Sequence, residues 1–390
     1  MDDRLRSTFS AACDGAVDGL ALVAVGGYGR QEMSPASDVD VVLVHDHASG
    51  AERVSRVAEA LWYPLWDDAV PLDHAVREAE GMVATAGVDL RVALGMLDAR
   101  HVAGDEQLAA RVRSRVLAEW RRTSASRLPE LRAACDARAE RAGEVAHAAI
   151  PDLKDSRGGL RDGVVLRALV ATWLVDVSHR EAETYRATVL DVRDVLHEVS
   201  GRRSDRLLPD LVPDVAQRLG REPQSLTFAL RDAGRRTAHL LDSTWRRLGP
   251  TTDAESARSS RWTLGRRPEI RPLDPTADAG VGRLGDEVVL TAAARPEADS
   301  LLALRAAALA AEQGLLLSRA SADRLAGSTC PLPEPWPPPA RRWLIRLLTS
   351  GPGLVPVWEE LDQAGVVDTW LPEWSRIRLL SSSAAVHRWT

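Results

Sequence analysis

The chain has 390 residues, of which 45% are hydrophobic and 27% charged, with a net charge of −6. These values are ordinary for a globular protein of two or three domains, and the acidic balance argues against nucleic acid as the main partner. No apolar run approaches the length of a membrane span, and the charged start Met1-Asp-Asp-Arg predicts neither signal peptide nor membrane anchor. The three cysteines lack metal or redox spacing, which favours the cytoplasm.

The N-terminal part alternates between apolar runs and helical patterns. We expect an opening helix over 2–17 and a second helix over 51–66, where apolar residues recur with helical spacing. Short, wholly apolar strands are predicted at 20–25 and 39–44, a third strand at 70–76, and an edge element at 96–102. Such strands need cover on both faces, so this part is predicted to be a small mixed sheet with helices.

Helical patterns dominate the remaining chain, which makes the fold class α+β. The expected helices are 105–147, 162–176, 182–199 and 224–248, followed by helical stretches at 297–328 and 340–375. A Pro-, Ser- and Gly-rich linker is predicted at 250–280, followed by a hairpin at 282–291 with Gly285-Asp286 as its turn. The predicted division is 1–104, 105–250, 251–380 and 381–390. The abrupt last segment predicts the start of a further element and hence a truncated chain.

The most informative stretch is Gly26–Asp40, which reads G-G-Y-G-R-Q-E-M-S-P-A-S-D-V-D between two predicted buried strands. Asp38 and Asp40 stand two residues apart, so both side chains emerge on one face of a strand. Paired carboxylates at this spacing can hold two Mg²⁺ ions that clamp the attacking and leaving oxygens of a phosphoryl displacement. The strand–turn–strand order is typical of a polymerase-β-type nucleotidyltransferase, and no complete P-loop or dinucleotide motif competes.

The turn itself predicts contacts to a nucleoside triphosphate. Gly26 and Gly27 allow the backbone to approach the phosphates closely, and Ser37 can donate its hydroxyl to a phosphate oxygen. Arg30 either neutralises phosphate or pairs with Glu32 or Asp38. A solvated strand edge beside an ordinary turn would explain each motif alone, but not their order between two buried strands.

A third carboxylate usually completes such a site as a base or an extra metal ligand. Asp73, in V-P-L-D-H-A-V, and Asp98, in G-M-L-D-A-R, are the candidates. Each could equally be an ion-paired aspartate, with Arg77 or Arg100 as its partner. Of the two we favour Asp98, and the choice between them stays open.

A second motif, I-P-D-L-K-D-S-R-G-G-L-R-D, covers residues 150–162 and contains the only lysine of the chain, Lys154. With Arg157 and Arg161 it forms a basic loop just before a predicted helix, which can close over an anion. The alternative is a solvated interdomain turn, since runs of charge are usually just solvated.

Together and in this order, the two motifs resemble the bacterial [protein-PII] uridylyltransferase/uridylyl-removing enzyme family. The first matches its G-G-x-G-R-x-E-x-x-P-x-S-D-x-D signature, and Lys154 with Gly158–Asp162 matches its K-x-x-x-G-G-L-R-D run. The segments 97–105, 205–220 and 364–374 also look like that family. The resemblance covers nearly the whole chain and is weakest across 250–280.

The resemblance implies an Mg²⁺-dependent nucleotidyltransferase of nitrogen regulation, which moves UMP, or in some actinobacteria AMP, from UTP or ATP to a tyrosine of the PII signal protein. It implies that 1–104 is the nucleotidyltransferase domain and 105–250 a helical domain that closes over the nucleotide. Asp38 and Asp40 would bind Mg²⁺, and Gly26, Gly27 and Ser37 the triphosphate. Lys154 and Arg161 would contact phosphate from the helical domain.

The departures from the family are equally informative. The family continues with a metal-dependent HD phosphohydrolase domain and two glutamine-sensing ACT domains, whereas this chain stops where the HD domain would begin, at 381–390. We therefore expect neither uridylyl-removing activity nor direct glutamine sensing. Some relatives carry a small residue where this chain has Asp73. The rival interpretations are a relative of the adenylyltransferase of glutamine synthetase and an inactive regulatory fragment that binds nucleotide without transfer.

Overall fold

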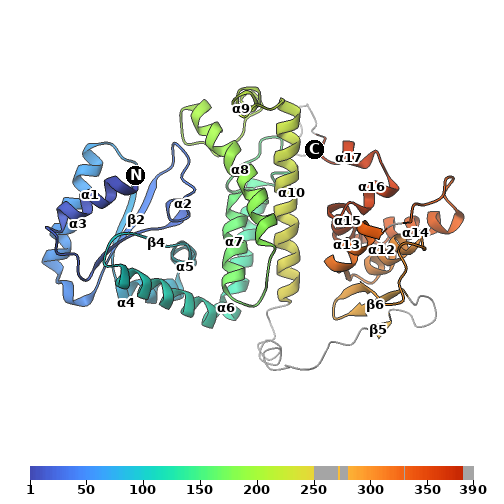
Figure 1. Cartoon of the computed structure of the whole chain (residues 1–390), viewed down its shortest axis with the longest axis horizontal. Helices are drawn as coiled ribbons and strands as arrows, with labels where there is room; N and C mark the ends of the chain where they lie inside the picture. Colours follow the sequence, from blue (N-terminus) through green and yellow to red (C-terminus); the bar gives the residue numbers. More distant parts are fainter. Residues whose placement is uncertain (250–270, 273–279, 329, 381–390) are drawn as a thin grey trace. The chain divides into compact units, whose positions relative to one another are not determined.

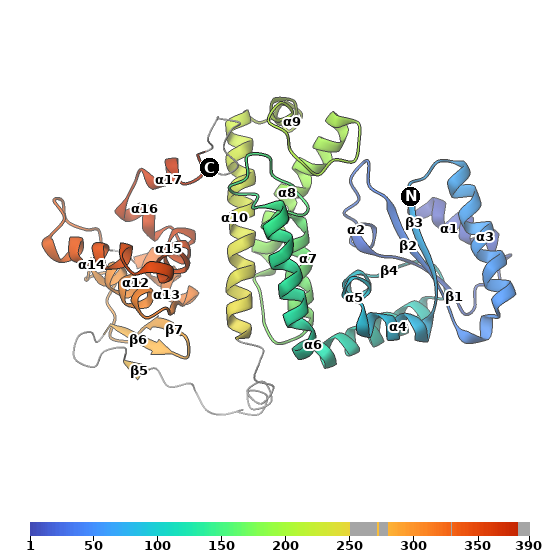
Figure 2. The ribbon, with the colours of Figure 1, turned by 180° about the vertical axis from the view of Figure 1, so that it is seen from behind.

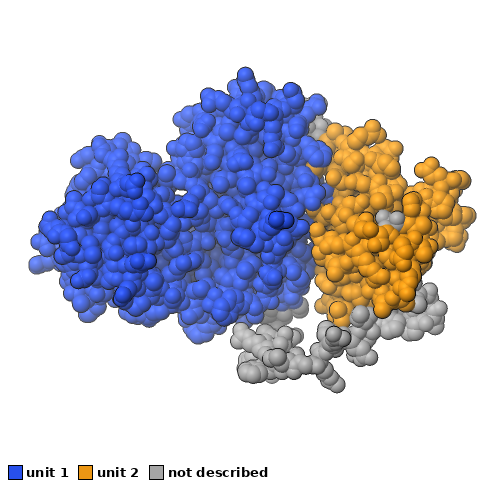
Figure 3. All heavy atoms as spheres, viewed as in Figure 1, with its two compact units in different colours: residues 1–257, 381–390 blue, residues 258–380 orange. Residues whose placement is uncertain are grey.

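The computed structural model describes residues 1–249, 271–272, 280–328 and 330–380, with helices and strands labelled as in Figure 1. These residues group into two compact units, one within 1–257 and the other within 258–380 (Figure 3). The predicted linker at 250–280 falls largely outside the described residues. The predicted start of a further domain at 381–390 lies wholly outside them.

The first unit begins with a four-stranded mixed sheet of order β3-β2-β1-β4. Strand β1 pairs antiparallel with both β2 and β4, whereas β2 and β3 run parallel. The strands are β1 (Leu20–Ala24), β2 (Val39–His45), β3 (Leu72–Glu78) and β4 (Arg100–Gly104). The small mixed sheet predicted from the apolar runs is confirmed, with strand ends shifted by a few residues.

Helices cover both faces of this sheet. Leu22 and Leu43 pack with α1 and α3 on one face, and Val23 and Val42 pack with α4, α5 and α6 on the other. Because every position of β1 is buried from one side or the other, the strand is apolar throughout. This sheet and its helices form the head of the first unit. The helices of the head are α1 (Asp2–Ala12), α2 (Gly26–Gly29), the 3-10 turn η1 (His47–Ser49), α3 (Ala51–Asp67), α4 (Ala79–Val88) and α5 (Leu90–Leu97).

A long helix, α6 (Glu106–Ala142), joins the head to a helical body and belongs to both. One hydrophobic core contains Val23 of the sheet, Val116 of α6 and Leu166 of α7. The indole of Trp120 on α6 donates to the carbonyl oxygen of Ala168, 2.9 Å away. The helices α7, α8 and α10 lie side by side in both views (Figures 1 and 2). The body helices are α7 (Leu160–Ala171), α8 (His179–Ser200), α9 (Val212–Arg218) and α10 (Pro223–Leu248).

The second unit combines a small sheet of order β5-β6-β7-β8 with an alanine-rich helical core around α12. Its predicted hairpin is confirmed, because Leu284 pairs with Glu287 across the turn Gly285-Asp286. The strands are β5 (Arg271–Pro272), β6 (Val281–Leu284), β7 (Glu287–Leu290) and β8 (Leu316–Leu317). The helices are α12 (Leu302–Glu312), α13 (Arg319–Ser328), α14 (Pro338–Leu348), the 3-10 turn η2 (Gly351–Gly353), α15 (Leu354–Gln363), α16 (Val366–Trp370) and α17 (Trp374–Ile377).

An α+β head followed by a mainly helical body is the architecture that the sequence predicts. The differences are local: α4, α5 and α9 were not predicted, and the helical stretch predicted at 340–375 consists of several short helices, with the Gly-Pro-Gly of η2 between α14 and α15. Among the described helices, none combines the length and apolarity needed to cross a lipid bilayer.

The Gly-Gly of the second motif has a packing role. Gly158 has φ +82°, and a Cβ atom at this position would meet the carbonyl oxygen of Gly234 on α10 at 2.1 Å. The basic loop therefore lies directly against the backbone of α10, an approach that only glycine permits.

We predict that Gly158→Ala destabilises the first unit far more than Gly220→Ala. Gly220 also has positive φ, +64°, but a Cβ there meets nothing within 4 Å. The control should lose about 1 kcal/mol from backbone strain, and Gly158→Ala about 3 kcal/mol or more, because a backbone contact is added to the same strain. Urea unfolding followed by tryptophan fluorescence measures both, and equal losses would contradict the packing role.

Candidate active site

Three aspartates, Asp38, Asp40 and Asp73, gather where strands β2 and β3 begin, a part of the head sheet that we call the carboxylate edge. Asp40 lies on β2 and Asp38 directly precedes that strand, so the two side chains share a face. Strands β2 and β3 are parallel with Asp40 opposite Asp73, which places Asp73 beside Asp40 on the same face. Burial, together with the charges of Asp73 and Asp38, raises the pKa of Asp40. The carboxylates are thus close enough to repel one another, and a bound cation would relieve that repulsion.

Asp38 already has a cationic partner, because its carboxylate accepts a hydrogen bond from Arg203 in the loop that follows α8. As the side chains stand, the described residues hold no group of three or more His, Cys, Asp or Glu that could bind a metal ion. A metal ion that used Asp38 would compete with Arg203 at this carboxylate.

The glycine turn approaches these carboxylates closely. Gly26 follows β1 with φ +57°, and a Cβ atom there would lie 2.6 Å from a carboxylate oxygen of Asp40. A side chain at this position would therefore displace Asp40. Gly27 is less constrained, since its nearest neighbour would be a backbone oxygen at 3.8 Å. The first glycine of the motif is thus needed for the approach to Asp40.

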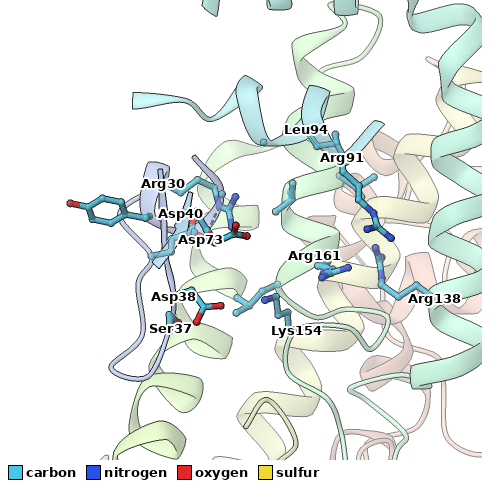
Figure 4. A pocket seen from close by; sticks show the side chains of 18 of the residues that line it. Arg30, Ser37, Asp38, Asp40, Asp73, Arg91, Leu94, Arg138, Lys154 and Arg161 are labelled. Atoms are coloured by element: carbon cyan, nitrogen blue, oxygen red, sulfur yellow. Dashed lines mark hydrogen bonds and ion pairs between the residues drawn. The ribbon is translucent and has the colours of Figure 1, made fainter. Parts of the chain in front are cut away.

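A cavity of about 690 Å³ separates the carboxylates from a basic wall. Figure 4 shows Asp38, Asp40 and Asp73 on one side and Lys154 and Arg161 on the other. The basic side chains that line the cavity are Arg30, Arg91, Arg138, Arg141, Lys154, Arg161, Arg193 and Arg203. Acidic groups on one side and a concentration of arginine on the other suit a ligand that carries both a divalent cation and several phosphate charges.

The cations of this wall are crowded. Burial lowers the pKa of Lys154, and the neighbouring Arg161, Arg193 and Arg203 lower it further, against the opposing effect of Asp205. Among the described residues no ion pair joins Lys154, whereas Arg161 pairs with Asp155 at 2.9 Å. An anion that entered the cavity would therefore relieve repulsion around Lys154.

Arg193 of α8 connects the body to the loop between α2 and β2, which contains Ser34, Ser37 and Asp38. Its guanidinium is buried and donates to the hydroxyls of Ser34 at 2.6 Å and Ser37 at 3.4 Å. The same side chain donates to Asp205 at 2.6 Å. Ser37, predicted to meet a phosphate, thus lines the cavity with its hydroxyl next to an arginine.

Glu32 gathers arginines from three elements. It accepts from Arg30, which ends α2, at 2.8 Å. It also pairs with Arg186 of α8 at 2.5 Å and with Arg167 of α7 at 3.6 Å. The Glu32 side chain is only 9% exposed. Of the partners proposed for Arg30, Glu32 is therefore observed and Asp38 is not.

Asp98 lies in this network and not at the carboxylate edge. It pairs with Arg30 at 3.2 Å and with Arg167 at 3.5 Å, and it is absent from the lining of the cavity that holds Asp38 and Asp40. The preference for Asp98 as the third carboxylate is therefore not supported by this geometry. The reason is the register of β2 and β3, which brings Asp73 next to Asp40.

Sequence reasoning missed Arg193 and Arg203. Both lie far along the chain from Asp38, at separations of 155 and 165 residues. Arg203 falls in the segment G-R-R-S-D-R, where several arginines have equal claim. Only the partners of each arginine in the folded chain distinguish those that face the cavity.

The chain is similar to known bacterial enzymes along its whole length. A family model described as GlnD PII-uridylyltransferase matches residues 127–248. The bifunctional uridylyltransferase/uridylyl-removing enzyme of Streptomyces coelicolor is 45% identical over 100% of this chain and 47% of its own length. The enzymes of the same description from Mycobacterium tuberculosis H37Rv and Corynebacterium glutamicum are 42% and 36% identical, each over 95% of this chain and over 46% and 51% of their own lengths.

The chain is a relative of these bifunctional enzymes. It spans about half the length of the curated relatives that it matches. The region matched by the family model runs from the second half of α6 to the end of α10 and contains the basic wall from Lys154 to Arg203. The similarity to the whole chain extends further and includes the carboxylate edge.

We predict that Glu32→Gln lowers the free energy of unfolding of the first unit by about 2–3 kcal/mol. The substitution leaves three arginines around a neutral amide in a largely buried place, where loss of one ionic partner is costly. Glu59→Gln is the matched control, because Glu59 is exposed and has only a hydrogen bond from Ser55. Urea unfolding of both variants makes the comparison, and a loss of less than about 0.5 kcal/mol in Glu32→Gln would contradict the role of Glu32.

Proposed function

We propose that this chain is a nucleotidyltransferase that moves UMP or AMP from a nucleoside triphosphate to a tyrosine of a PII protein. The observation that carries the proposal is the cavity in which Asp38, Asp40 and Asp73 face Lys154 and Arg161. The acceptor is inferred from the relatives, which are uridylyltransferases by name, and from the PII-uridylyltransferase family model. The uridylyl-removing activity in those names forms no part of the proposal.

The carboxylate edge fits Mg²⁺. Hard oxygen ligands are the ones that Mg²⁺ prefers. The pKa of Asp40 is raised by burial and then by the charges of Asp73 and Asp38, and a cation would relieve the repulsion among these carboxylates. Asp38 and Asp40 would hold the metal, in a two-ion site if Asp73 takes part. Mg²⁺ would supply charge neutralisation and orientation to the in-line displacement. Gly26 leaves room for the Asp40 carboxylate itself, which a side chain at position 26 would displace.

The remaining chemistry falls to the protein side chains. Lys154, Arg161 and Arg193 would bind the triphosphate, with Gly27 and Ser37 near the phosphates on the head side, and Arg30 held in place by Glu32. The tyrosine oxygen attacks the α-phosphorus, a P–O bond forms, and the bond to pyrophosphate breaks. The tyrosine proton passes to a carboxylate, for which Asp73 is the group beside Asp40.

The nucleoside has an apolar region of the same cavity available. Leu94 of α5, Leu131 of α6 and Val165 of α7 are among its lining residues. Stacking or packing of a base against such a surface is tolerant of base identity. UTP and ATP therefore both remain candidate donors.

The proposal predicts that the chain, given Mg²⁺, PII protein and either UTP or ATP, adds one nucleoside monophosphate per PII subunit. Intact mass spectrometry of PII measures the addition and identifies the base. The Asp38→Asn/Asp40→Asn double variant should abolish it, because the metal ligands are removed. Modification of glutamine synthetase in place of PII would support the rival adenylyltransferase function. Nucleotide binding without any transfer would support the inactive fragment.

We further predict that Asp73→Asn slows transfer by about 10²–10⁴-fold with the affinity for Mg²⁺-nucleotide reduced much less, as expected for loss of a general base. Asp98→Asn should act mainly on stability through Arg30 and Arg167. Single-turnover rates and calorimetric nucleotide affinities separate the two outcomes. Transfer that is unimpaired in Asp73→Asn but lost in a folded Asp98→Asn variant would restore Asp98 as the third carboxylate.

A further inference from the structure

Arg203 pairs with a carboxylate that the proposed reaction needs for its cation. Its guanidinium donates to Asp38, and the two side chains are 49% and 34% exposed. Arg203 lies in the short loop that follows the end of α8 at Ser200. The loop ends at Arg206, whose backbone forms an isolated β-bridge with that of Asp152. The contact is thus made by an exposed loop residue that crosses from the body to the head.

The pairing is competitive with metal binding. The guanidinium of Arg203 occupies one carboxylate oxygen of Asp38, Oδ2, and places a positive charge beside the other, so a divalent cation at Asp38 meets both a competing donor and charge repulsion. Arg203 therefore hinders Asp38 from coordinating a cation. Removal of Arg203 should leave Asp38 free to do so.

Arg203 differs from its neighbours in how it is held. Arg193 is buried and fixed by Ser34 and Asp205. Arg161, in the first turn of α7, pairs with Asp155 in the loop just before that helix. For Arg203 the described residues offer Asp38 as its one ion-pair partner, so it can turn without breaking a second contact.

A destination for the guanidinium lies in the same cavity. Arg203 lines it together with Lys154, Arg161 and Arg193, the side chains that crowd positive charge around Lys154. Triphosphate oxygens placed among these cations would attract Arg203 away from Asp38, because a guanidinium binds phosphate through paired N–H donors.

We infer that Arg203 is an exchange residue of the nucleotide site: it holds Asp38 until a nucleoside triphosphate enters with its divalent cation, and it then transfers to the phosphates. This inference rests on the proposed function for the identity of the ligand. It gives Arg203 two opposite effects on binding: the residue lowers the affinity for the free cation and raises the affinity for the triphosphate. A residue that served only as a phosphate contact, or only as a structural ion pair, would show one effect or neither.

The test compares Arg203→Ala with Arg202→Ala in the full chain. Arg202 is the exposed neighbour in the same loop and has no side-chain partner among the bonds of the described residues. Free Mn²⁺ counted by electron paramagnetic resonance gives the affinity for the cation alone. Isothermal titration with UTP and ATP at saturating Mg²⁺ gives the affinity for the triphosphate.

We expect Arg203→Ala to bind Mn²⁺ about 3- to 10-fold more tightly and the Mg²⁺-triphosphate about 10-fold more weakly, with Arg202→Ala unchanged in both. Adding Asp38→Asn to Arg203→Ala should remove the gain in Mn²⁺ affinity, because that gain depends on the freed carboxylate. Unchanged or weaker Mn²⁺ binding in Arg203→Ala overturns the inference, as does unchanged triphosphate binding or an equal effect of Arg202→Ala.

The inference and the proposed function fail in different ways. Opposite shifts in the two affinities, with no transfer to PII by the unsubstituted chain, would sustain the exchange role and reject the acceptor. Transfer to PII without those opposite shifts would sustain the function and reject the exchange role. Absence of both Mn²⁺ and nucleotide binding in the unsubstituted chain would reject both.

Discussion

The whole site depends on how the head is held against the helical body, and Glu32 does much of this holding. It lies just after the glycine turn and forms ion pairs with Arg30, Arg167 and Arg186, so that the turn, α7 and α8 share one largely buried carboxylate. The long helix α6 adds a common hydrophobic core to the same arrangement. Without this connection, the carboxylates and the basic side chains would belong to separate surfaces.

Once the two parts are held together, opposite charges line one cavity. The carboxylates repel one another at the sheet edge, and the cations repel one another around Lys154. Each side is therefore unfavourable by itself and suited to a ligand of the opposite charge. In the proposed reaction, a nucleoside triphosphate with Mg²⁺ supplies both charges at once, and Arg203 already bridges from one side to the other.

The sequence predicted those parts that local spacing encodes. The apolar strands, the placement of Asp38 and Asp40 on one face and the basic loop at Lys154 follow from alternation and motif order. The choice between Asp73 and Asp98 stayed open, because the parallel register that brings Asp73 beside Asp40 depends on two strands separated by a whole helix. Arg203 was likewise missed, since its role comes from a contact 165 residues away in the chain.

A crystal structure with Mg²⁺ and a UTP analogue that cannot be cleaved between its α- and β-phosphates tests the central claim, that both sides of the cavity bind one nucleotide. The account predicts phosphates between Asp40 and Lys154, with the metal on Asp38 and Asp40. It also predicts that Arg203 has left Asp38. A nucleotide bound to the head alone, with its phosphates remote from Lys154 and Arg161, would contradict the account.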